Sequence, residues 1–196
     1  MRSFAATGIG AALLAISCSL SPKDDPSQFY VLTATHDSSP TASSDQILGL
    51  GPIALPAYLL RPQMVTRVND NQITLAEYQR WGENLTDGFT RVLAEQLKQA
   101  TGARQVLQFP WLVSLTVDYS IEIDVSRFEG NRSGLVDLLA GWRIRDGLTR
   151  GIVSTGDSHF SQQAASDTPE AVVVAQSQVM AALSRELAAA LRNIEQ

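Results

Sequence analysis

The chain has 196 residues, a length that one domain accounts for, since domains usually take roughly 100 to 200 residues. Apolar residues make up 44% and charged residues 18%, which predicts a globular protein with one hydrophobic core and excludes a disordered chain. The formal net charge is −5. Residues 1–17 contain one charged residue, Arg2, so the rest of the chain has 14 basic and 20 acidic residues and a net charge of −6. This acidic balance disfavours nucleic-acid binding, which needs a basic surface.

The N-terminus has the pattern of a secretory signal peptide over residues 1–17. Arg2 precedes an uncharged apolar run of 13 residues, 4–16, which is shorter than the roughly 20 residues of a bilayer span. A buried first helix is the alternative, but Gly8 and Gly10 and the lack of a polar face disfavour it. We therefore expect this segment to direct export.

Residues 14–18, Leu-Ala-Ile-Ser-Cys, resemble a lipobox, in which small residues precede a cysteine that receives lipid. The motif departs from the usual pattern at Ala15, where leucine is most common. Cys18 is the one cysteine of the chain, so no intrachain disulfide competes for it, although a small buried thiol is the alternative. Each buried methylene of an acyl chain contributes ~0.8 kcal/mol, so two or more chains together hold a protein stably on a membrane. Ser19 follows in place of aspartate, which in bacterial lipoproteins implies sorting to the outer membrane.

Residues 18–28 are predicted to form a lipidated N-terminus and tether, and residues 29–196 a single domain. Residues 19–28 are polar, contain Pro22 and Pro26, and extend at most about 35 Å. The domain is therefore expected close to the membrane, on its periplasmic face.

Short strands are predicted in the first half of the domain, because β-rich segments alternate with turn residues. They are expected at residues 29–32, 47–55, 64–68 and 72–75, with a polar loop at 33–46. Gly49 and Gly51 indicate a bend or a close backbone approach within the second strand, and Pro56 ends it. The last two strands flank residues 69–71 as a hairpin.

Two helices are predicted from apolar residues at steps of three and four. The first runs from Leu85 to Ala100 and ends at Gly102. The second begins after Thr168 as N-cap, with proline and glutamate in its first turn, and its apolar stripe continues to Ile194.

An antiparallel meander is predicted between the helices. Apolar and polar residues alternate from Trp111 to Val125, which favours a long strand with one buried face. The phase breaks at residues 127–128, and two further strands are expected at 135–145 and 148–160. Together these patterns predict an α+β (mixed α/β) single domain, with an antiparallel-rich sheet and two main helices packed on one face.

The sequence contains no pattern that predicts a catalytic, metal or cofactor site. Residues 49–54 match a dinucleotide fingerprint, but the prolines that follow exclude the helix this motif opens. His36 and His159 lie in no metal-ligand spacing. Three carboxylates share one face of the predicted long strand with other polar residues, which favours a solvated face over an acid/base pair: Asp118, Glu122 and Asp124. We expect a protein that is not an enzyme and binds no cofactor.

A proline-spaced block, residues 51–67, carries the clearest functional signal: Gly-Pro-Ile-Ala-Leu-Pro-Ala-Tyr-Leu-Leu-Arg-Pro-Gln-Met-Val-Thr-Arg. With residues 29–32, 80–81 and 91–93 it resembles the PqiC-type (YmbA-like) ABC-type transport auxiliary lipoproteins, over about residues 18–194. The resemblance implies a non-catalytic outer-membrane component of a lipid-transport system between the two bacterial membranes. It implies two partners, an inner-membrane subunit and a periplasmic MCE-domain protein that forms a tunnel, and a homo-oligomeric ring.

Two roles suit the proline-spaced block. As a protein-contact surface it would use a rigid backbone, which loses little entropy on binding. The residues expected in that contact are Pro56, Tyr58, Leu59, Arg61, Pro62, Gln63 and Arg67. Alternatively, the prolines shape an internal corner and the apolar residues enter the core, and the sequence does not distinguish the two.

Two other classes of function compete with docking. A periplasmic ligand-binding lipoprotein of an ABC importer is disfavoured because one domain offers no hinge between two lobes. An envelope hydrolase is disfavoured because the chain has no G-x-S-x-G nucleophile motif.

Overall fold

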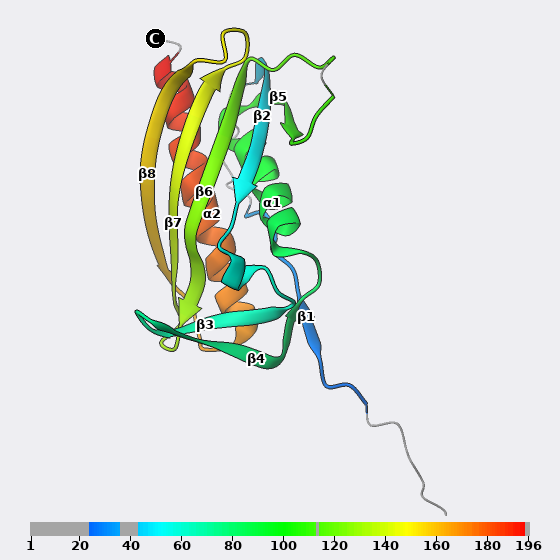
Figure 1. Cartoon of the computed structure of the whole chain (residues 1–196), viewed down its shortest axis with the longest axis vertical. Helices are drawn as coiled ribbons and strands as arrows, with labels where there is room; N and C mark the ends of the chain where they lie inside the picture. The colour runs from blue at the N-terminus through cyan, green and yellow to red at the C-terminus, as the bar shows by residue number, and fades with distance from the viewer. Residues whose placement is uncertain (1–23, 36–42, 113, 195–196) are drawn as a thin grey trace, which may run out of the picture.

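Within the residues that the structure describes, 24–35, 43–112 and 114–194, eight strands form one mixed sheet and two long helices lie against one of its faces (Figure 1). The structure is a computed structural model. Its elements are β1 (Gln28–Tyr30), β2 (Ser44–Ala54), the 3-10 helix η1 (Ala57–Leu59), β3 (Gln63–Asn69), β4 (Gln72–Trp81), α1 (Leu85–Thr101), β5 (Ala103–Gln108), β6 (Tyr119–Asn131), β7 (Leu135–Asp146), β8 (Ile152–Gln163) and α2 (Pro169–Ile194). The predicted α+β class is confirmed.

Strand β6 organises the sheet. Along one edge, its first half pairs in parallel with β2 and its C-terminal end pairs in parallel with β3. Along the other edge β7 runs antiparallel, and β8 extends the sheet beyond β7. The chain therefore leaves β2 and enters β3 on the same edge of β6, and residues 55–62 form the corner between the two strands.

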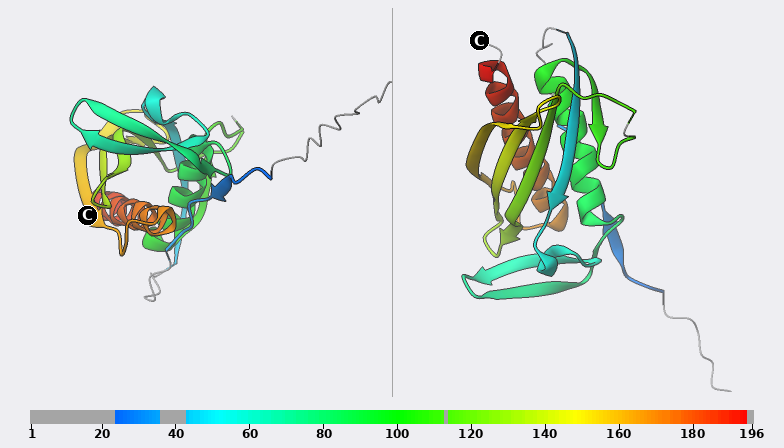
Figure 2. Two further views of the ribbon diagram at one scale, coloured as in Figure 1. Left: turned by 90° about the horizontal axis from the view of Figure 1, so that it is seen from below. Right: turned by 45° about the horizontal axis from the view of Figure 1, so that its top comes forward.

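The helices form the second layer, as two views show (Figure 2). Helix α1 lies against β2 and β5, α2 lies against β6, β7 and β8, and the helices pack on each other. Asn84 caps α1 by accepting a hydrogen bond from the Thr86 amide at 2.9 Å, and Gly102 ends it with φ 69°. The rings of Phe89 and Phe128, with centroids 5.0 Å apart, join α1 to β6.

The C-terminal helix has the predicted start and the predicted buried stripe. The Thr168 hydroxyl accepts a hydrogen bond from the Ala171 amide at 3.3 Å, so Thr168 is the N-cap. Leu183 and Leu187 are 0% exposed and Leu191 is 2% exposed. The helix is therefore part of the domain core.

The predicted strand from Trp111 to Val125 is wrong in its first half, because β6 begins only at Tyr119. Trp111 instead packs across β2, and a Cβ on Gly49 would stand 2.6 Å from its ring. Val117 is buried but Leu115 is 44% exposed, so the alternation of apolar and polar residues in this loop does not reflect alternating burial. The close approach expected at the β2 glycines is confirmed, and Gly51 has φ 113°.

Other strand limits also differ from the sequence prediction. Strand β5 was not predicted, since it follows Gly102 without a loop. Strand β8 begins at Ile152 and not at residue 148, because the Asp146 carboxylate accepts hydrogen bonds from the amides of Leu148 and Thr149 at 3.1 and 2.7 Å and holds a turn. Strands β2 and β4 are longer than expected. The signal peptide, Cys18 and His36 lie outside the described residues.

Candidate functional site

The proline-spaced block forms the corner between β2 and β3. Pro56 precedes η1, and its carbonyl accepts a hydrogen bond from the Leu59 amide at 2.9 Å. Leu59 is 2% exposed and belongs to the core. Beyond η1, the Pro62 carbonyl accepts a hydrogen bond from the Trp81 amide at 2.7 Å, which ties the end of the corner to β4.

A buried carboxylate holds the corner from inside. Glu129 is 2% exposed, and its Oε2 accepts hydrogen bonds from the Tyr58 hydroxyl at 2.9 Å and the Phe128 amide at 3.0 Å. Its Oε1 accepts a hydrogen bond from Nε of Arg67, a side chain that is 17% exposed. Burial raises the pKa of Tyr58, and the hydrogen bond to Glu129 raises it further, so the phenol stays protonated and continues to donate.

The guanidinium of Arg67 completes this cluster. It lies over the Tyr58 ring, with 5.7 Å from its central carbon to the ring centroid, and also donates to the Tyr58 hydroxyl at 3.2 Å. A third hydrogen bond, 3.1 Å long, runs to the Asp70 carbonyl in the β3–β4 turn. The cluster therefore connects the corner, the hairpin and β6.

The other predicted contact residues face outward or lie along the hairpin. Pro62 is exposed, and Leu60, which lies in the block but outside the predicted set, is 48% exposed. The half-buried Arg61 donates from Nε to the Tyr58 carbonyl at 2.7 Å, and Gln63 pairs with Arg80 at the start of β3. The structure thus divides the predicted set into a buried anchor and an exposed rim.

Glu129 was not among the residues that the sequence singled out. The phase break at residues 127–128 was its one signal, and the structure shows a bulge in β6 just before it, between Val125 and Arg127. Nothing in the sequence connects Glu129 with Tyr58, from which it is separated by 71 positions.

The remaining segments that carry the resemblance lie together at the same end of the domain. Strand β1 pairs in parallel with β4, so that Tyr30 stands opposite Trp81. Arg91 of α1 donates to the Leu32 carbonyl at 3.1 Å and forms an ion pair with Glu83. These contacts fix the point at which the N-terminal segment leaves the domain.

The three carboxylates of the expected solvated face have separate roles. Asp118 accepts from the Ile47 amide at 2.7 Å. On β6, Glu122 accepts from Arg145 at 2.7 Å and from Arg143 at 3.1 Å, and the same Arg143 reaches Asp124 at 3.0 Å. The hydrogen bond from Arg145 lowers the pKa of Glu122, and that from Arg143 lowers it further. These carboxylates are thus occupied by structural partners.

A cluster of serine, histidine and aspartate lies on β7 and β8, but its geometry is not that of a hydrolytic triad. Nε2 of His159 is 3.3 Å from both Asp137 Oδ1 and Ser161 Oγ, and the serine donates directly to the aspartate. A triad uses opposite ring nitrogens for the acid and the nucleophile. Within the described residues, no group of three or more His, Cys, Asp or Glu side chains could hold a metal ion.

The sequence model of the ABC-type transport auxiliary lipoprotein component matches residues 30–188. The chain therefore belongs to this family, and the resemblance inferred from the sequence is confirmed.

An uncharacterized protein of known crystal structure is 19% identical, with a TM-score of 0.70, over 84% of this chain and 98% of its own. Protein XCC0632 from Xanthomonas campestris is 18% identical, with a TM-score of 0.63, over 83% of this chain and 93% of its own. At these identities the likeness is one of fold. No curated protein matches the chain. No helix in the described part of the chain has the length and apolar character needed to cross a bilayer.

Proposed function

We propose that the protein is a lipid-anchored outer-membrane subunit of an MCE-type lipid-transport system, on the periplasmic face of the membrane. It docks without catalysis to a periplasmic MCE-domain protein and assembles with copies of itself, and an inner-membrane subunit completes the system. Family membership supports a role in transport. The observation that carries the docking role is the corner at residues 55–62, which is fixed from inside by Glu129 and exposes Leu60.

A surface fixed before binding associates more tightly than a mobile one, because less conformational entropy is lost. The corner meets this condition through the hydrogen bonds of Tyr58 and Arg67 to one buried carboxylate. Aromatic residues and arginine often dominate interface energies, but here Tyr58 and Arg67 face inward, toward Glu129. We therefore assign the contact to the outer rim, Leu60, Arg61 and Pro62, and give the buried cluster the task of positioning it.

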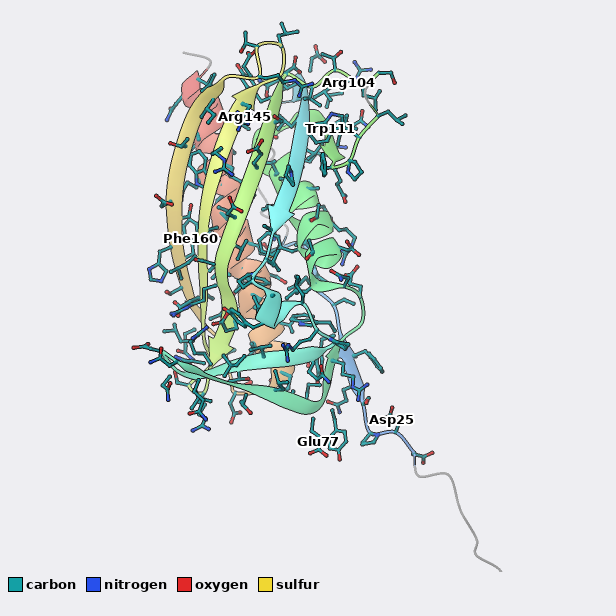
Figure 3. The ribbon with its side chains drawn as sticks, viewed as in Figure 1. Asp25, Glu77, Arg104, Trp111, Arg145 and Phe160 are labelled. Carbon is teal, nitrogen blue, oxygen red and sulfur yellow. The ribbon has the colours of Figure 1, made fainter. Side chains whose placement is uncertain are left out.

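The position of the tether supports this assignment. The described chain begins at Asp24, and Asp25 lies at the same end of the domain as Glu77 of β4, whereas Arg104 and Trp111 lie at the opposite end (Figure 3). The β3–β4 hairpin thus belongs to the end from which the tether leaves (Figure 1). A short tether from Cys18 would keep this end near the bilayer and limit the directions from which a partner can approach.

The docking role predicts that Leu60→Glu weakens assembly without unfolding the domain. The side chain is half exposed, so the folded state tolerates a charge, whereas an interface would bury it unpaired. We expect at least a 30-fold weaker association, the equivalent of about 2 kcal/mol. Sedimentation would measure self-assembly, and co-purification from membranes would measure the MCE partner.

Leu148→Glu is the matched control, because Leu148 is 85% exposed in the turn between β7 and β8, at the opposite end of the domain. It should assemble as wild type does. Normal assembly of Leu60→Glu, or loss of assembly in Leu148→Glu alone, would move the contact surface away from the corner.

The lipid anchor is tested separately by Cys18→Ala. This change removes the acyl acceptor of the lipobox, so the protein should lose its place in the outer-membrane fraction and accumulate unlipidated. Cell fractionation and mass spectrometry of the N-terminal peptide are the measurements. Wild-type and variant proteins that fractionate alike would contradict anchoring through Cys18.

A further inference from the structure

A cavity of about 170 Å³ lies between the β3–β4 hairpin and the first turns of α2. The hairpin meets β6 through only two parallel pairs, Thr66 with Gly130 and Arg67 with Asn131, so it closes over the end of the domain without filling the space behind it. Apolar side chains from six elements line the cavity: Leu59, Met64, Trp81, Leu85, Phe128 and Val172.

The cavity has the size of one aromatic ring system. An apolar cavity of about 150 Å³ in a protein binds benzene. The present cavity is slightly larger, so it accommodates a benzene or indole ring and is too small for a whole membrane lipid.

One lining side chain specifies the polarity of the occupant. Gln176 of α2 is 3% exposed, and its Nε2 donates to the Phe128 carbonyl at 3.1 Å. Its Oε1 is buried and accepts no hydrogen bond from the described part of the chain. A buried acceptor without a donor is unfavourable, and an occupant with a single N–H or O–H removes that cost.

Polar residues surround the entrance of the cavity. Arg132 and Asp167 are exposed there, and Gln79 is half-buried. A pocket with an apolar wall and polar residues at its mouth is the arrangement in which interfaces hold an aromatic anchor residue.

We propose that this cavity is a socket for the side chain of a tryptophan or tyrosine of the docking partner, with its N–H or O–H donating to Gln176. The inference rests on the proposed docking function and gives it a second point of contact at the same end of the domain. An aromatic ring fills the volume, and its one donor supplies the bond that Gln176 lacks.

Indole, indene and benzofuran test the socket directly because they share one shape. Indole carries an N–H donor, benzofuran carries an oxygen acceptor, and indene has no polar group. The ¹³C-labelled methyl of Met64 reports on the cavity, while that of Met180, which is fully buried and does not line it, is the internal reference. On the full chain we expect indole to bind about fivefold tighter than indene, the equivalent of one hydrogen bond of about 1 kcal/mol, and benzofuran no better than indene.

Gln176→Leu separates recognition from simple packing. It removes the acceptor, so the preference for indole over indene should disappear, whereas a purely structural role would weaken all three probes alike. Equal affinities in the wild type, or a preference that survives in Gln176→Leu, would overturn the hydrogen-bonding role.

The source of the ring is tested with N-acetyltryptophanamide, which carries the indole on a backbone. Binding within about tenfold of free indole supports a protein side chain, and its exclusion would indicate a free small molecule instead. Octanoate provides a third arm: if it shifts the Met64 signal at lower concentrations than indole does, the cavity takes acyl chains and the proposal is wrong.

A filled cavity distinguishes this inference from the docking function itself. Ala76→Leu places a larger side chain on the cavity wall, so it should abolish indole binding and weaken partner association. Ala54→Leu is the control, because Ala54 is exposed on β2 and does not line the cavity, and it should have neither effect. Loss of indole binding with normal partner association would reject the socket as a docking site. The docking function would then still stand or fall with Leu60→Glu.

Discussion

Replacing Glu129 with alanine is expected to lower the free energy of unfolding by about 3 to 5 kcal/mol, because removal of one partner leaves a largely buried charge uncompensated. Arg67 loses its carboxylate, and both the Tyr58 hydroxyl and the Phe128 amide lose their acceptor. Urea denaturation monitored by circular dichroism measures the loss. A decrease of this size is a large share of the ~5 to 15 kcal/mol that stabilises a typical domain.

Glu122→Ala is the matched control for Glu129→Ala. Its carboxylate also binds arginine, but both arginines are partly exposed, with side chains 43% and 31% accessible. Exposed ion pairs contribute about 0 to 1 kcal/mol, so this variant should unfold nearly as the wild type does. If the two variants were equally stable, the cluster would not hold the corner, and the fixed rim on which the docking proposal rests would lose its physical basis.

The helices were predictable because their signals are local. Each helix signal lies within the segment that it defines: the apolar step of three and four residues, the glycine that ends α1, and the Thr168 N-cap. Strand pairing is not local. The sequence gives no sign that β2 and β3 share one edge of β6, since parallel partners are distant in the chain. The predicted meander of β6, β7 and β8 was correct because antiparallel neighbours follow each other directly.

The candidate site was predictable in its location but not in its internal arrangement. Tyr58 and Arg67 were expected in a contact surface because both belong to the proline-spaced block, residues 51–67. After the bulge in β6, Phe128 faces α1, so Glu129 faces the opposite side of the sheet, where alternation predicts solvent. The corner covers that position and turns it into a buried one. Only the three-dimensional path of the chain contains this information.

Leu187→Ala is expected to destabilise the domain by about 2 to 5 kcal/mol, the cost of truncating a buried leucine and leaving a cavity. Leu187 is 0% exposed on α2, the helix that covers β6, β7 and β8. For a domain of this size each kcal/mol lowers Tm by roughly 2 to 4 °C, so thermal melting resolves the change.

Leu148→Ala makes the same chemical change at a side chain that is 85% exposed, and it should stay within about 0.5 kcal/mol of the wild type. The comparison matters for the docking proposal, because α2 contributes both Val172 and Gln176 to the cavity wall. A helix fixed by its buried stripe keeps that wall in place before a partner arrives, and binding then loses less entropy. If Leu187→Ala melted at the wild-type temperature, α2 would not be held by the core, and the cavity would have to form only on binding.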